Sequence, residues 1–115
     1  MKIQNKILTL EEARNQPRFH DYGNGDYGYK DEDGYWRLVI NGVDVLEGKK
    51  AIDCHYYKNG VYIYKVEGGG WHLVINGVDL LEGKKATWCK YYENGDYSYK
   101  VEGGEWHKID IKAIK

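Results

Sequence analysis

The chain has few of the residues, and none of the segments, that mark several common classes of protein. Its 115 residues include one proline, one phenylalanine and two cysteines. No apolar run approaches the roughly 18 residues that a membrane-spanning helix needs, and segment 1–16 lacks the apolar stretch of a signal peptide. These absences predict a cytoplasmic protein, and the length predicts a single domain, 1–115.

An excess of one sign of charge is also missing. Seventeen basic and 18 acidic side chains give a formal net charge of −1. Proteins that bind phosphate backbones or anionic lipids without specificity need a strong positive field. We therefore expect no generic nucleic-acid binding and no membrane binding.

Residues that usually carry catalysis do not occur as sets. Ser98 is the only serine, and Cys54 and His55, as neighbours on a strand, point to opposite faces. The glycine pattern at 23–28 matches a dinucleotide-binding motif, but the Tyr-rich segment that follows predicts a strand where that motif needs a helix. The sequence predicts no enzyme and no cofactor.

The histidines do not form a metal-binding set either. His20 and His55 share one repeat position with Lys90, and His72 and His107 share another with Arg37. A cation in each set cannot complete a three-histidine site. We expect no metal.

What the chain does contain is an internal repeat. Segments 36–70 and 71–105 agree at 26 of 35 positions. A decayed copy precedes them at about 1–35, with one extra residue near Pro17, and a closing strand is expected at 106–114. Self-similarity at a period of this length is typical of repeat architectures.

Turn residues predict that each repeat is a run of short antiparallel strands. Asn-Gly occurs five times and favours two-residue type I′ hairpins; it is found at positions 24–25, 41–42, 59–60, 76–77 and 94–95. Gly68-Gly69, Gly103-Gly104 and Asp33-Gly34 are expected to join successive copies by similar turns. The four strands of the best-defined copy are predicted at 71–75, 78–81, 86–92 and 96–102.

Two-residue turns would fix which side chains share a face. They place Ile75 opposite Val78, Tyr64 opposite Leu73 and Val66 opposite Trp71. The predicted core face then comprises Tyr62, Tyr64, Val66, Trp71, Leu73, Ile75, Val78 and Leu80. Apolar residues on the other face indicate that another layer, another chain or a ligand covers it.

The fold class is therefore all-β, with about three 35-residue units of four strands. A meander that closes as a barrel-like or propeller-like sheet is favoured over a β-trefoil. Cys54 and Cys89 lie one repeat apart, which predicts free thiols, although a pairing stays open if the two copies meet there.

Tyrosine and tryptophan, with 12 and 4 occurrences, exceed what a thin core needs. Such rings are favoured anchors in protein interfaces and sugar sites. Positions that differ between copies, or that lie away from the predicted core, are candidates for binding a partner: Arg37, Tyr56, Ile63, His72, Trp88 and Tyr91. We expect a non-enzymatic protein-binding module, such as an inhibitor or immunity-type protein that blocks a larger partner. The alternative is a small carbohydrate-binding module that uses exposed Tyr and Trp, and self-association into a homo-oligomer stays open.

The unit at 71–104, with its Trp strand, Asn-Gly hairpin and Gly-Gly hairpin, resembles the short aromatic-glycine β-repeats of bacterial proteins, the WG-type and propeller-like repeats. The resemblance covers about residues 18–110. It implies interaction through a repeated surface and carries no catalytic residues to this chain.

Overall fold

The computed structural model describes residues 7–58, 60–92 and 94–109. Over these residues the chain is an antiparallel all-β fold with one short helix, α1, at Leu10–Ala13. The strands are β1 Phe19–Gly23, β2 Asp26–Lys30, β3 Trp36–Ile40, β4 Val43–Asp44, β5 Ala51–Lys58, β6 Val61–Val66, β7 Trp71–Ile75, β8 Val78–Asp79, β9 Ala86–Tyr91, β10 Tyr97–Val101 and β11 Trp106–Ile109. The prediction of an all-β class is confirmed.

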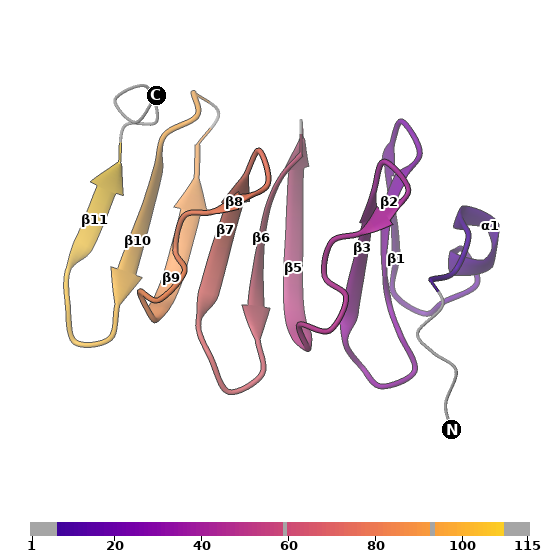
Figure 1. Cartoon of the computed structure of the whole chain (residues 1–115), viewed down its shortest axis with the longest axis horizontal. Coiled ribbons are helices and arrows are strands. Elements are labelled where there is room, and N and C mark those ends of the chain that lie inside the picture. The colour runs from indigo at the N-terminus through magenta and orange to yellow at the C-terminus, as the bar shows by residue number, and fades with distance from the viewer. Residues whose placement is uncertain (1–6, 59, 93, 110–115) are drawn as a thin grey trace.

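The strands form two sheets that follow one another along the molecule (Figure 1). The first has the order β1-β2-β3-β4, and the second has the order β11-β10-β9-β7-β6-β5, with β8 paired to β7. The principal extents are 42 × 30 × 21 Å and the radius of gyration is 14.8 Å, against about 13 Å for a compact chain of this length. Because β5 and β11 end the larger sheet, the described residues form no closed barrel.

Three of the five Asn-Gly pairs form the predicted type I′ hairpin turns. Asn24, Asn41 and Asn76 have φ of 55°, 54° and 55°, and each following glycine is also at positive φ, as type I′ turns require. Asn59 lies outside the described residues. At the fifth position the N–H of Gly95 donates to the carbonyl of Tyr92, and Gly95 has φ 96°. That loop is therefore a longer turn closed by a glycine bulge.

The turn at Gly68-Gly69 differs from the predicted type I′. Gly68 is at φ 72°, Gly69 is not at positive φ, and the N–H of Gly69 donates to the carbonyl of Val66 at 3.1 Å. This is type II geometry, which needs positive φ only at its third residue. The Gly103-Gly104 turn repeats it, and in the Asp33-Gly34 turn only the glycine is at positive φ.

The different turn shifts the register by one residue and reverses the predicted faces. Lys65 pairs with Trp71 and Ile63 pairs with Leu73, so the expected pairs of Val66 with Trp71 and Tyr64 with Leu73 are wrong. Since side chains alternate along a strand, Tyr62 and Tyr64 lie on the face opposite to Trp71 and Leu73. The predicted pair Ile75 and Val78 is confirmed, but the prediction of Val78 as a core residue is wrong, since Val78 is 57% exposed.

Both faces of β6 and β7, in the middle of the larger sheet, are buried, each in its own cluster. The C-terminal cluster joins Ile63, Trp71 and Leu73 to Cys89 and Tyr97. The central cluster packs the opposite face against the first sheet and contains Leu38, Leu46, Ala51, Cys54, Tyr62, Tyr64 and Val74. The layer expected to cover the second face is thus another part of the same chain. Full burial of a leucine such as Leu38 or Leu73 stabilises the fold by about 1.5–3 kcal/mol.

Helix α1 caps the other end of the molecule in place of a repeat turn. Ala13 packs with Tyr27, Tyr29 and Val39, and Thr9 forms a capping box with Glu12. The repeat alignment puts Glu12 where Gly48 has φ 76°. Glutamate avoids that conformation and favours a helix, so the segment folds as a helical turn.

Candidate functional site

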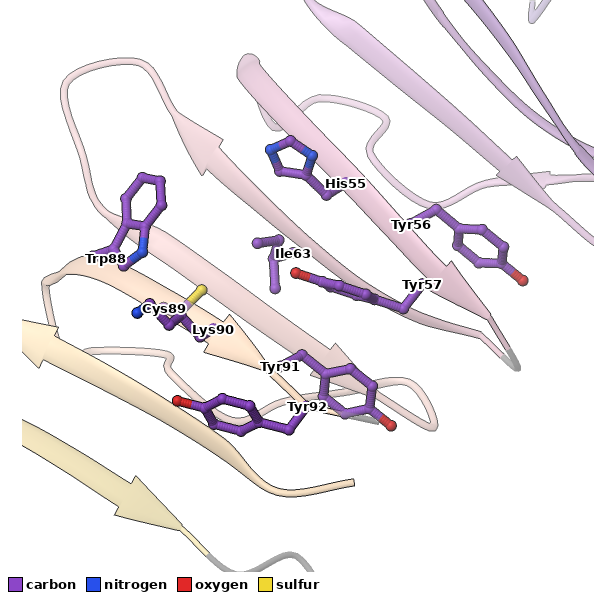
Figure 2. A pocket seen from close by; sticks show the side chains of 9 residues that line it. All are labelled: His55, Tyr56, Tyr57, Ile63, Trp88, Cys89, Lys90, Tyr91 and Tyr92. Carbon is purple, nitrogen blue, oxygen red and sulfur yellow. The ribbon is translucent and has the colours of Figure 1, made fainter. Parts of the chain in front are cut away.

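Four of the six predicted binding residues line one cavity of about 450 Å³ between β5 and β9. They are Tyr56, Ile63, Trp88 and Tyr91. The rest of the lining comprises His55, Tyr57, Cys89, Lys90 and Tyr92. Figure 2 shows how the rings of Tyr57, Trp88, Tyr91 and Tyr92 surround Ile63 and Cys89. We refer to this cavity as the aromatic groove.

Contacts between rings hold the walls of the groove together. The ring centroids of Tyr57 and Tyr91 are 5.0 Å apart in a tilted arrangement, which joins β5 to β9. Trp88 packs edge-on against buried Trp71 at 5.3 Å, and His55 stacks on the same indole at 6.2 Å. Aromatic pairs in these geometries stabilise by about 0.5–1.5 kcal/mol beyond the area they bury. The groove is therefore held by contacts that exist before any ligand binds.

Ile63 forms part of the buried wall of the groove and is not a surface anchor. Its exposed fraction is 4% and it belongs to the C-terminal cluster, because the one-residue register shift turns it inward. Its equivalents are Gly28 and Ser98. A Cβ at Gly28 would lie 3.3 Å from the ring of Tyr22, so that tyrosine occupies the space that Ile63 fills one unit later.

The tyrosine that precedes each of these residues changes accordingly. Tyr22 is half-buried over Gly28, and the hydroxyl of Tyr92 is 3.0 Å from Oγ of Ser98. Tyr57, over Ile63, is 38% exposed and forms no hydrogen bond with the described residues. Ile63 has no hydroxyl that could bond to Tyr57 as Ser98 bonds to Tyr92. The hydroxyl of Tyr57 is therefore available to a ligand in the groove.

Other polar groups of the groove also lack protein partners. Neither the hydroxyl of Tyr91 nor the indole N–H of Trp88 is hydrogen-bonded within the part of the chain that the structure describes. Trp88 is 46% exposed. These groups are free to bond to a ligand that covers the rings.

Tyr56 has a different role from the one predicted for it. Its hydroxyl donates to Oδ2 of Asp26 at 3.1 Å and accepts the N–H of Gly60 at 3.4 Å. Its ring packs against the central cluster and points away from the other rings in Figure 2. The prediction that Tyr56 and Tyr91 face away from the core is wrong, since Tyr91 also packs against a core cluster.

Arg37 and His72 lie outside the groove and occupy equivalent positions, where each contacts carboxylate oxygens. Arg37 donates to Asp31 and to Asp44, both at 2.8 Å, and Nδ1 of His72 is 2.8 Å from Asp79. Burial disfavours the guanidinium charge, but hydrogen bonds to Asp44 and Asp31 outweigh it and raise the pKa of Arg37. The sequence difference at this position is explained by the presence of Asp31, whose equivalent is Val66.

Sequence reasoning did not single out Tyr57, Tyr92, His55 or Lys90 as groove residues. The signal was present, because Tyr22, Tyr57 and Tyr92 are 35 residues apart and each precedes one of the variable positions 28, 63 and 98 by six residues. A bulge in β5 between Tyr56 and Lys58 decides which tyrosine turns inward, and simple alternation does not predict it.

The groove contains no activated nucleophile. Burial raises the pKa of the Cys89 thiol to about 12, so the thiol is protonated at neutral pH. Burial, with a smaller contribution from Cys89, also raises the pKa of Tyr57. The arrangement can bury apolar or ring surfaces and form hydrogen bonds, which are the properties of a binding site.

Within the described ranges, no three His, Cys, Asp or Glu side chains gather in a group that could hold a metal ion. The described residues also contain no helix long and apolar enough to cross a membrane. Comparison with known proteins finds no match to the chain among family models, curated proteins or solved structures.

Proposed function

We propose that the chain is a non-catalytic protein-binding module that docks a segment of its partner in the aromatic groove. The supporting observation is the gathering of exposed rings and unpartnered polar groups at this one place. Trp88, Tyr57 and Tyr92 are 46%, 38% and 40% exposed. Folding buries aromatic rings, whereas protein interfaces use Trp and Tyr as their anchors.

The proposed architecture is a row of three blade-like units of about 35 residues, in which each inner face is buried by the next unit. Such a row presents an extended surface and suits a protein that blocks a larger partner, as an inhibitor or immunity-type protein does. A repeated framework with a few changed positions is a common basis for binding surfaces.

The test is capture of partners from the native host, with identification by mass spectrometry, followed by measurement of affinity for any stoichiometric partner. Trp88→Ala should weaken the complex by about 2 kcal/mol, or roughly 30-fold, since central aromatic anchors have effects of this size. The matched control is Val78→Ser, which changes a side chain that is 57% exposed away from the groove. An unchanged affinity in Trp88→Ala would remove the groove as the docking site.

A carbohydrate ligand is the second candidate, and the free indole and tyrosine hydroxyls of the groove favour it. Sugar rings stack on such indoles and bond to such hydroxyls. A glycan array distinguishes the two candidates: specific hits that Trp88→Ala abolishes would support sugar binding, and an array without hits would exclude it.

A further inference from the structure

The outer side of the last three strands carries a pattern that folding does not require. Register places Trp88, Lys100 and Trp106 in one row across β9, β10 and β11, and Lys90, Ser98 and Lys108 in the next. The ring of Tyr92 lies beside Ser98. We call these seven residues the terminal face.

Comparison with the inner units shows that the terminal face is not built to pack against another unit. Residues 35 positions earlier are buried: Val61, Ile63 and Leu73 are 5%, 4% and 0% exposed and belong to the C-terminal cluster. Their counterparts are all polar: Asp96 is partly exposed, Lys108 is exposed, and Ser98 is 5% exposed and hydrogen-bonded to Tyr92. A polar outer face is typical of the end of a repeat array, and it disfavours a second copy stacked in the same way.

Two aromatic residues of this face, Tyr92 and Trp106, nevertheless match Tyr57 and Trp71 one unit earlier. Trp71 is 4% exposed inside the array, whereas its counterpart Trp106 is 44% exposed. A solvent-facing cap does not need a large apolar ring at that position. Exposed rings on a flat sheet are typical of a surface that a partner covers.

Charge indicates the chemistry of that partner. Within β9, β10 and β11 the face presents three lysines and no carboxylate, although the whole chain has a formal charge of −1. Nζ of Lys90 lies 5.1 Å from the ring centroid of Trp106, and Nζ of Lys108 lies 6.0 Å from that of Tyr92. Cation–π contacts hold these ammonium groups in place, so less side-chain freedom is lost when an anion binds.

We propose that the terminal face binds an acidic segment of a protein partner. Carboxylates pair with Lys90, Lys100 and Lys108, while an apolar side chain covers Trp88. Single-stranded nucleic acid is disfavoured, because bases need open ring faces for stacking and ammonium groups already cover the rings of Trp106 and Tyr92. The inference rests on the proposed protein-binding function and extends it from the groove to the terminal face, which shares Trp88, Lys90 and Tyr92 with the groove.

The experiment uses the full chain and three fluorescent probes: a peptide of alternating glutamate and phenylalanine, its lysine counterpart, and a short oligothymidylate. Fluorescence anisotropy should show saturable binding of the acidic peptide alone, weakening as salt is added. The triple variant Lys90→Gln, Lys100→Gln, Lys108→Gln should weaken it about tenfold, since three exposed ion pairs are lost. The control Lys30→Gln, Lys49→Gln, Lys84→Gln removes the same charge away from the face and should leave binding unchanged.

Equal loss in both triple variants would overturn the proposal, because net charge alone would then explain binding. So would preference for the oligonucleotide, or no binding of any probe. Tyr57→Ala separates this inference from the proposed function, since it alters the groove and leaves the terminal face intact. Weaker capture of the native partner with unchanged peptide binding would support both sites, whereas unchanged capture with lysine-dependent peptide binding would remove the groove and keep the face.

Discussion

At the residue scale, equivalent positions in successive units hold side chains of different chemistry in similar geometry. Arg37 bridges Asp31 and Asp44, while His72 contacts Asp79 and no other acidic side chain of the described residues. Exposure differs as well: the side chains of Arg37 and Asp44 are 15% and 3% exposed, and those of His72 and Asp79 are both 22% exposed. The first ion pair is therefore the more buried of the two.

We expect Arg37→Met to lower the free energy of unfolding by about 3 kcal/mol, because it leaves the buried Asp44 carboxylate without its cation. His72→Met should cost about 1 kcal/mol, since Asp79 stays partly solvated. Urea unfolding of the two variants measures both values. Equal losses would contradict the assignment of the first pair as the more buried one.

At the element scale, one glycine decides where two strands meet. A Cβ on Gly70 would lie 2.6 Å from the carbonyl oxygen of Ala86, and this close approach allows Trp71 of β7 to pair with Ala86 of β9. Tyr35 occupies the equivalent position before β3, and its hydroxyl donates to Glu67. No pairing of β3 with β5 occurs there, so the first sheet stays separate.

Gly70→Ala should therefore cost about 2 kcal/mol, because the added methyl group forces β7 and β9 apart. Gly68→Ala, at φ 72° but with open space around its Cβ, should cost about 1 kcal/mol from backbone strain alone. Urea midpoints of the two variants give the comparison, with Tyr35→Ala as the matched position in the first unit. A larger loss of stability in Gly68→Ala than in Gly70→Ala would contradict the conclusion that the close contact with Ala86 requires a glycine at position 70.

Strands and tight turns could be predicted from sequence, because Asn-Gly pairs and the alternation of apolar and polar residues determine structure over a few neighbouring residues. The four strands predicted at 71–102 agree with β7 to β10 within about two residues at each end. The face of the sheet on which each side chain lies could not be predicted, because Gly68-Gly69 permits more than one type of turn. A shift of one residue in the register of β6 and β7 moves Ile63 from the surface to the core. The groove was partly predicted, through Trp88 and Tyr91, because it forms where the copies differ.

At the scale of the whole molecule, burial of acidic hydroxyl and thiol groups couples folding to alkaline pH. The pKa of Cys54 is raised to about 12, mainly by burial and further by Asp53, and burial raises that of Cys89 to about 12. Burial likewise raises the pKa of Tyr22 and Tyr62 to about 12. The folded state thus favours the neutral forms of all four groups.

Stability should be fully present below about pH 9, where these groups are neutral in the unfolded chain as well. It should fall as pH rises from there toward 12, because the unfolded chain loses protons first. Urea unfolding across this range measures the effect. Cys54→Ala, Cys89→Ala should remove the part of the decline between about pH 9 and 10, and a profile flat to about pH 12 would contradict the burial of these groups.

The two cysteines can also be used to measure how the core clusters open. Cys54 lies in the central cluster and Cys89 in the C-terminal cluster, both thiols are free, and they are only 8% and 3% exposed. An alkylating reagent reaches each thiol only when its cluster opens, so two labelling rates, read separately by mass spectrometry, compare the opening of neighbouring clusters. Equal rates at the two sites would mean that the two clusters open together, and unequal rates would show which of the two opens first.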